Sequence, residues 1–162
     1  MTEVQNFAHL HVHTDYSRID GLGTVEAKVH EAKRLGFSSL AITDHGTLSG
    51  AVSFYSVCLA NGIKPIIGVE GYVELDGKIN HITLLANGNR GLSNLIKINN
   101  IGHRSELARP AFRVDDILRY SDDVMLLTGC QASPFYNLSY EEARSLAQKF
   151  KSAMPGRVFA EV

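Results

Sequence analysis

Apolar and polar positions change period several times along the chain, and each change predicts an element. Short apolar runs alternate with amphipathic stretches, which is the pattern of repeated β-α units. Strands are expected at residues 7–13, 39–43, 64–70, 72–75, 80–86, 123–128 and 157–162, and helices at residues 24–35, 49–61, 91–101, 114–120 and 139–152. We therefore expect one α/β domain over residues 1–162.

The first expected helix carries the clearest boundary signals. Thr24 is a suitable N-cap, and Gly36 is a stop signal directly after the last helical position. Apolar side chains between them recur at helical spacing, which predicts one buried stripe. The stripe consists of Val25, Val29, Ala32 and Leu35.

Two further local signals specify a turn and a second helix start. Asp76-Gly77 is a short turn signal, so the strands on either side of it are expected to pair as a hairpin. Ser139 and Glu142 have the spacing of a capping box, in which each side chain bonds the other residue's backbone N–H. Both signals depend only on neighbouring residues.

Composition and charge narrow the class of protein. The chain has 162 residues, of which 44% are hydrophobic and 20% charged, as in ordinary globular domains. No apolar run approaches the roughly 20 residues of a membrane span, and the N-terminus does not resemble a signal peptide. Cys58 and Cys130 are too far apart in sequence to suggest a disulfide framework, so we expect a reduced, cytoplasmic protein without membrane contact.

The charge balance bears on nucleic-acid binding. With 16 Lys and Arg against 17 Asp and Glu, the formal net charge is −1. Domains that bind mainly through phosphate backbones carry a clear basic excess. Any contact with nucleic acid is therefore expected from a metal site, or from other parts of a larger protein.

Histidines occupy every second position near the start of the chain, in the segment FAHLHVH at residues 7–13. On a strand this spacing places His9, His11 and His13 on one face, a grouping that folding alone does not require. Imidazole is a common ligand of zinc, iron and manganese. A solvated histidine-rich edge is the alternative, whereas an affinity tag is disfavoured because apolar residues separate the histidines.

Other candidate ligands fall at the ends of expected strands. Asp44 and His45 follow one strand, Glu70 ends another, and Cys130 follows a third. In a parallel barrel or open sheet, side chains at these ends converge on one site, so the set predicts a metal centre. Each residue also has a plainer interpretation: Asp44 as a helix cap, Cys130 as a small core residue, and His81 as a satisfied histidine within a strand.

Five stretches of the chain form recognisable motifs that follow one another along the sequence. They are HLHVHTDYSRIDG (9–21), LAITDHGTLSGAVSFY (40–55), GIKPIIGVEGYV (62–73), HITLLANGNRGLSNLIKI (81–98) and TGCQAS (128–133). Together they resemble the PHP (polymerase and histidinol phosphatase) domain, most of all the one that opens bacterial DNA polymerase III alpha subunits. The similarity spans nearly the whole chain and is far more specific than a lone motif.

The resemblance implies a PHP-type distorted (β/α)7 barrel of the TIM-like kind, with a cleft that holds up to three divalent ions. Mixed nitrogen, oxygen and sulfur donors suit zinc, or manganese and iron. The implied ligands are His11, His13, Asp20, His45, Glu70, His81 and Cys130. The resemblance implies that Glu70 bridges two ions and that His9 contacts the ligands without binding an ion itself. The family's final Asp-x-His motif does not occur before Val162, so the barrel is expected to be incomplete at its C-terminus.

The resemblance also implies metal-assisted hydrolysis of a phosphoester. In polymerases of this type that reaction is 3′–5′ exonuclease proofreading. Asp44 could orient His45 or act as an acid-base group. Tyr16, Arg104 and Arg109 are expected to contact substrate, with a rim aromatic and a solvated loop as the alternatives. The expected partners are a DNA 3′ end or another phosphoester, and the remainder of a polymerase III alpha chain or other replisome subunits.

Two other functions stay open at this point. One is a non-catalytic module that binds metal to stabilise a polymerase, which the missing final motif favours. The other is a free-standing phosphatase for a small phosphomonoester, which the polymerase-like segments at 40–55 and 81–98 disfavour. Hydrolysis by this chain alone is not implied by the resemblance.

Overall fold

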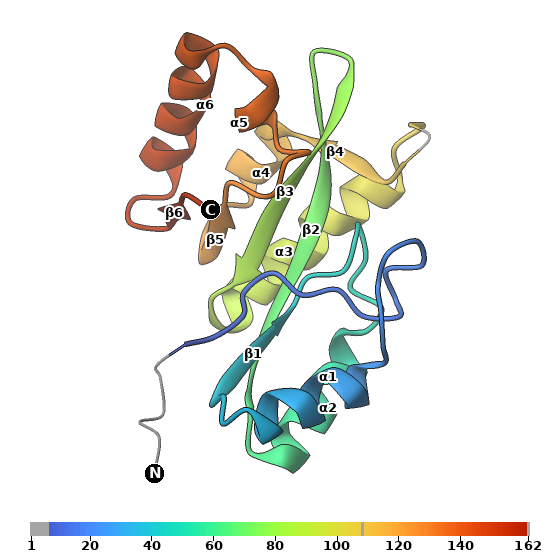
Figure 1. The fold of residues 1–162 in the computed structure, drawn as a ribbon. Helices are drawn as coiled ribbons and strands as arrows, with labels where there is room; N and C mark the ends of the chain where they lie inside the picture. The colour runs from blue at the N-terminus through green and yellow to red at the C-terminus, as the bar shows by residue number, and fades with distance from the viewer. Residues whose placement is uncertain (1–6, 108, 162) are drawn as a thin grey trace.

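A curled mixed sheet is the centre of the computed structural model, which describes residues 7–107 and 109–161 (Figure 1). The strands follow the order β1 (Ser39–Ile42), β2 (Lys64–Leu75), β3 (Lys78–Ala86), β5 (Val124–Leu127) and β6 (Val158–Phe159), and β4 (Ala111–Arg113) also pairs with β2. The β2–β3 and β3–β5 pairs are antiparallel, and the other pairs are parallel. The described sheet therefore forms an open half-barrel, which confirms the expected incomplete barrel-like α/β fold.

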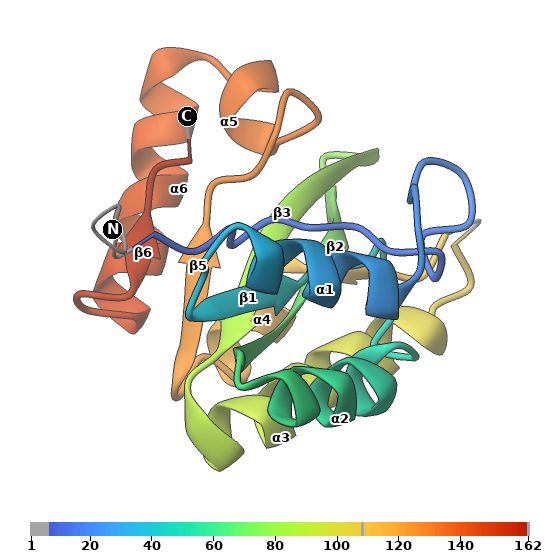
Figure 2. The same ribbon diagram turned by 60° about the horizontal axis from the view of Figure 1, so that its bottom comes forward.

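Helices cover the sheet in two groups (Figures 1 and 2). A pair formed by α1 (Val25–Arg34) and α2 (Ala51–Asn61) packs beside β1 and the start of β2. The second group packs on the convex face and consists of α3 (Gly88–His103), α4 (Val114–Arg119) and α6 (Tyr140–Ala153), while the short α5 (Pro134–Asn137) lies near β3. Over the described residues, no helix is both long and apolar enough to cross a bilayer.

The hairpin between β2 and β3 forms as the turn signal predicts. Leu75 pairs with Lys78, so the loop contains only Asp76 and Gly77, whose φ angles are 50° and 76°. Positive φ at both positions defines the turn that suits the twist of paired strands. The prediction that a strand ends at Glu70 was wrong, because β3 pairs with β2 continuously from Gly68 to Leu75.

In α1, the spacing of apolar residues predicts three of the four buried positions correctly. Thr24 accepts a hydrogen bond from the backbone of Ala27, and Val25, Val29 and Ala32 are buried as expected. Leu35 is 52% exposed, so its place in the buried stripe was wrong. It follows the last helical residue, where the chain turns into Gly36 at φ 80° and leaves the helical phase.

The start of the described chain lies beside β1 without forming a regular strand. Its backbone accepts hydrogen bonds from Ala41 to His9 and from Thr43 to Val12. His9 and Val12 are three residues apart but face partners only two apart, so one extra residue bulges from the ladder. The Thr43 hydroxyl completes this bulge by accepting from the Val12 N–H at 2.7 Å. The predicted regular strand at 7–13 was therefore wrong.

The remaining expected elements form with small shifts. The Ser139–Glu142 capping box is present at the start of α6. The last strand is shorter than expected, and Val162 lies outside the described residues. The elements β4 and α5 were not predicted.

Candidate metal centre

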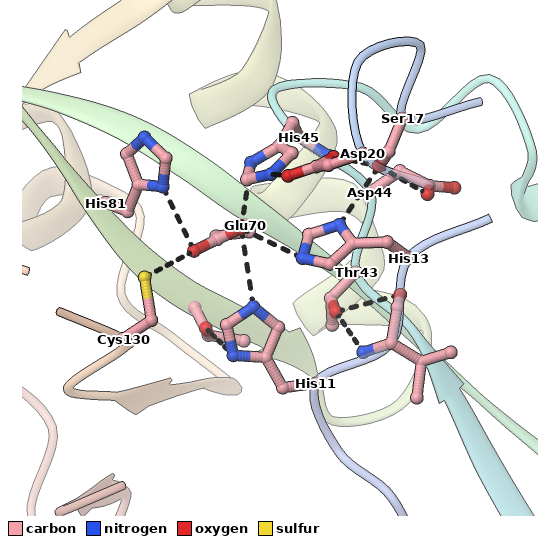
Figure 3. Close-up of polar contacts among 12 residues, drawn as sticks. His11, His13, Ser17, Asp20, Thr43, Asp44, His45, Glu70, His81 and Cys130 are labelled. Carbon is pink, nitrogen blue, oxygen red and sulfur yellow. Dashed lines mark hydrogen bonds and ion pairs between the residues drawn. The ribbon is translucent and has the colours of Figure 1, made fainter. Parts of the chain in front are cut away.

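Glu70 is the centre of a cluster of imidazoles on the concave side of the sheet (Figure 3). Its side chain is 1% exposed, although a carboxylate is rarely buried without partners. Its two oxygens face four histidines and one thiol. The distances are 3.3 Å from His11 Nε2, 3.1 Å from His13 Nε2 and 2.8 Å from His45 Nδ1 to Oε2, and 3.1 Å from His81 Nδ1 and 3.4 Å from Cys130 Sγ to Oε1.

Strand register accounts for part of this convergence. Glu70 pairs with Thr83 across the hairpin, and Tyr72 pairs with His81, so these four side chains share one face. The chain brings Cys130 to the same place, because the His81 N–H bonds the carbonyl of Ala132 in the loop after β5.

The residues next to β1 complete the cluster from the other side. His45 follows β1 and forms an isolated parallel bridge with Glu70. His11 and His13 lie on either side of Val12, whose backbone is held by Thr43. Convergence therefore depends on the hairpin register and the bulged N-terminal segment, rather than on parallel strand ends alone.

Mutual contacts shift the pKa values of the cluster. Burial raises the pKa of Glu70, but its close polar contacts with the surrounding histidines outweigh burial and hold that pKa well below its usual range. Burial also lowers the pKa of His11, yet contacts with Glu70 and Glu161 raise it to about 9. The close polar contact with Glu70 is the largest cause that raises the pKa of His45 despite burial, and Asp20 raises it further.

The donor set fits divalent metal ions. Three imidazole nitrogens face one oxygen, Glu70 Oε2. Among the described residues, however, this oxygen and His45 Nδ1 are buried without a well-oriented hydrogen bond. Atoms of this kind are better satisfied by a cation than by one another. Three groups of donors have ligand atoms within 4.8 Å of one another: His11 with His13 and Glu70, His13 with Asp20 and His45, and His45 with Glu70 and His81.

Asp44 is buried below the cluster and holds the loop that carries His13. Its carboxylate accepts from the Thr14 N–H at 2.6 Å, the Thr14 hydroxyl at 2.8 Å and the Ser17 hydroxyl at 2.7 Å. Because Ser17 donates to Asp44, its oxygen is left to accept from His13 Nδ1 at 3.0 Å. Nε2 of a neutral His13 then has a free lone pair toward Glu70. This geometry favours positioning by Asp44; the acid-base role stays a prediction.

Glu161, after β6, was not found by sequence reasoning. Its carboxylate accepts from His11 Nδ1 at 2.6 Å, which directs His11 Nε2 to Glu70. The Glu161 N–H is held by the Thr128 hydroxyl at 2.9 Å. The available signal was an acidic residue near the end of the strand expected at 157–162, the same kind of signal that marked Glu70.

The structure gathers the predicted ligands but not every other predicted residue. Asp20 lies at the rim, 2.8 Å from His45 Nε2. His9 is exposed and packs against the rings of Phe7 and Phe37, because the bulge takes it out of phase with the other two histidines. Arg104 caps the end of α3 through its backbone and is exposed. Tyr16 and Arg109 line a cavity that also includes His45.

The fold is an α/β half-barrel of the kind found in metal-dependent phosphoesterases. The fold is similar to that of a Bifidobacterium adolescentis protein assigned as a metal-dependent phosphoesterase, with a TM-score of 0.65 and 13% identity over 95% of this chain and 76% of that one. A Bacteroides vulgatus two-domain protein with a PHP-like metal-dependent phosphoesterase gives a TM-score of 0.58 and 17% identity over 91% of this chain and 42% of that one.

The sequence comparisons define the family more narrowly. The family model of the PHP domain matches residues 9–162, and the chain belongs to this family. It is 33% identical to the DNA polymerase III subunit alpha of Borreliella burgdorferi over 96% of this chain, and 34% identical to that of Treponema pallidum over 91%. The chain spans only 15% and 14% of the length of these relatives.

Proposed function

We propose that the cluster around Glu70 is a multinuclear metal centre that hydrolyses phosphoesters. The observation that carries the proposal is the convergence of four imidazoles and one thiol on a single buried carboxylate. Glu70 Oε2 faces His11 and His13, and its Oε1 faces His81 and Cys130. A carboxylate in this position can bridge two ions.

Each residue then has a distinct task. His11, His13 and Glu70 would hold one ion, and Glu70, His81 and Cys130 a second. Asp20 and His45 would contribute to a third position at the rim. Divalent ions in such a centre supply a water of lowered pKa and neutralise charge on the phosphate oxygens. Glu161 and Ser17 fix the far nitrogens of His11 and His13.

Within this reaction class, the polymerase relatives favour a nucleic-acid substrate. The proposal is 3′–5′ exonuclease proofreading in DNA replication, by a domain that works with the remainder of a polymerase III alpha chain in the cytoplasm. The likeness to these subunits over nearly the whole chain supports this narrower form. The same centre acting on a small phosphomonoester is the competing form.

Metal content is the first test, measured by mass spectrometry on protein purified without chelator. We expect more than one equivalent of metal in the wild type and a clear loss in Glu70→Gln. Glu74→Gln is the matched control, because Glu74 lies on the same strand but contacts Arg113 and the Gly77 N–H at the far end of the hairpin. A folded wild-type chain without metal would contradict the proposal.

Hydrolysis is tested next with 3′-mismatched primer–template DNA and with a small phosphomonoester. Release of the 3′ nucleotide that is lost in Glu70→Gln but kept in Glu74→Gln supports the exonuclease. Cleavage of the monoester alone supports the phosphatase.

A structural metal centre is the second candidate. The cluster joins the N-terminal segment, β2, β3 and the loops after β1 and β5, which are far apart in sequence. A metal ion held by these segments would stabilise the fold by cross-linking them. Bound metal that raises the melting temperature without hydrolysis of either substrate would favour this role.

A further inference from the structure

A second cavity, of about 450 Å³, opens beside the metal centre and shares His45 with it. Its other walls come from the loop at residues 15–19, from Tyr72 on β2, and from the end of α3 and the loop after it. Cavities of roughly 300–1,000 Å³ are typical of small-molecule sites. The space is therefore in the range for a nucleotide unit next to a group bound at the cluster.

A row of planar side chains connects the cluster with this cavity. His13 stacks on His45 with ring centroids 4.2 Å apart, and His45 stacks on Tyr72 at 5.9 Å with an interplanar angle of 13°. The Arg109 guanidinium lies 5.1 Å from the Tyr72 ring centroid in a cation–π contact. Arg109 thus reaches the row through Tyr72, and an anion bound to it would lie next to the Glu70 cluster.

The position of Tyr72 is fixed by close packing. Its side chain is 8% exposed and its ring meets His81 edge-on at 5.0 Å. Gly46 has φ 59°, and a Cβ at this position would lie 2.9 Å from the Tyr72 ring and 3.0 Å from Pro110. The Gly46 carbonyl in turn accepts from His103 Nε2 at 2.8 Å. Tyr72 is therefore a rigid platform for the guanidinium.

Positive charge gathers at this cavity although the chain carries a net charge of −1. The described residues that line it include Arg18 and Arg109, against the acidic Asp15. Guanidinium groups suit phosphate because they donate two parallel hydrogen bonds. The arrangement favours an anion that is larger than one phosphate and extends outward from the metal centre.

We propose that this cavity binds the phosphate adjacent to the scissile one in a single nucleic-acid strand, with Arg109 donating to its oxygens. The strand would run from the Glu70 cluster past Tyr72. This inference rests on the proposed function and names its substrate as a strand with at least two phosphates. A small phosphomonoester would occupy the cluster without reaching Arg109.

The test compares Arg109→Ala with Arg119→Ala in the metal-loaded chain. Arg119 is a matched control because its guanidinium also lies over a tyrosine, 5.4 Å from the Tyr120 ring, but outside this cavity. Binding of a labelled single-stranded DNA oligonucleotide is measured by fluorescence anisotropy at several salt concentrations. We expect about tenfold weaker binding for Arg109→Ala. Its slope of log affinity against log salt should also fall by about 0.7, the value for one phosphate contact on a single strand.

Equal binding by both variants, or an unchanged salt slope in Arg109→Ala, would overturn the inference. Hydrolysis of bis-p-nitrophenyl phosphate, a diester with one phosphate, supplies a second readout. Arg109→Ala should lower hydrolysis of this diester less than it weakens oligonucleotide binding, and an equal loss of both in Arg109→Ala but not in Arg119→Ala would overturn a separate subsite. Arg109-dependent oligonucleotide binding without any hydrolysis would support the subsite while contradicting the proposed function.

Discussion

The β2–β3 hairpin carries two faces of opposite character. On the convex face Val69, Val73, Ile82 and Leu84 are fully buried against the helices of the second group. On the concave face the same strands present Glu70, Tyr72, His81 and Thr83. Because side chains alternate along a strand, one hairpin supplies both part of the core packing and two donors of the candidate metal centre, Glu70 and His81.

The two faces differ in what stabilises them. Apolar burial on the convex face contributes roughly 1.5–3 kcal/mol for each large side chain and needs no ligand. The concave face instead buries an ionised carboxylate, which is costly unless cations neutralise it. Contacts with Glu70 and Glu161 raise the pKa of His11 to about 9, so this imidazole can carry one compensating proton when no metal ion is bound. We therefore expect the fold to depend on the convex face and metal binding on the concave one.

The largest expected effect comes from the convex face. Leu84→Ala removes a fully buried side chain between the sheet and the helices. It should lower the free energy of unfolding by about 2–5 kcal/mol, measured by urea denaturation with and without metal. Metal content of the folded variant should stay at the wild-type value. Loss of metal from a folded Leu84→Ala protein would show that the two faces are not separable.

A smaller effect is expected from Glu161→Gln on the concave side. The amide would lose the charge-assisted contact that directs His11 Nε2 toward Glu70. Metal affinity should fall by about 10–100-fold, as for other partners of ligating histidines, and is measured by competition with a chromogenic chelator.

Glu142→Gln serves as the control, because Glu142 is an exposed carboxylate that caps α6. Unfolding in urea should be nearly the same for Glu161→Gln and wild type without metal. Unchanged affinity in Glu161→Gln would assign Glu161 to folding alone.

The smallest expected effect is a difference in chemical labelling between the two cysteines, and its measurement needs no mutation. Cys58 is fully buried between α1, α2 and β1, and burial raises the pKa of its thiol to about 11. It should stay protonated and unmodified by iodoacetamide at pH 8 in the folded chain. Cys130 is exposed and should react, and added zinc should protect it. Equal labelling of Cys130 with and without zinc would exclude it as a ligand.

Sequence reasoning succeeded where neighbouring residues decide the structure. The Thr24 cap, the Asp76-Gly77 turn and the Ser139–Glu142 box all formed, because each depends on contacts within a few residues. The predicted ligands also cluster, although through the hairpin register and the bulged N-terminal segment rather than through parallel strand ends alone. Their role as ligands remains a prediction.

Sequence reasoning failed where contacts between segments far apart in the chain determine the structure. The three-residue β4 exists because it pairs with the far half of β2, which no local pattern shows. Glu161 gains its place through a hydroxyl on Thr128, 33 residues earlier in the chain. His9 looked equivalent to its two neighbours until a contact with Thr43 broke the alternation.

Because Thr43 contacts Val12, the length of the N-terminal segment matters as much as its amino-acid composition. The extra residue between His9 and Val12 sets which imidazoles face inward. Deleting a single residue there would remove the bulge and change the phase of the segment, so that either His9 joins the face of His11 and His13 or these two turn away from Glu70. We therefore expect point substitutions at exposed positions of this segment to be tolerated, and insertions or deletions of one residue to change which histidines reach Glu70. In natural variants, this segment should vary in composition while keeping a constant length.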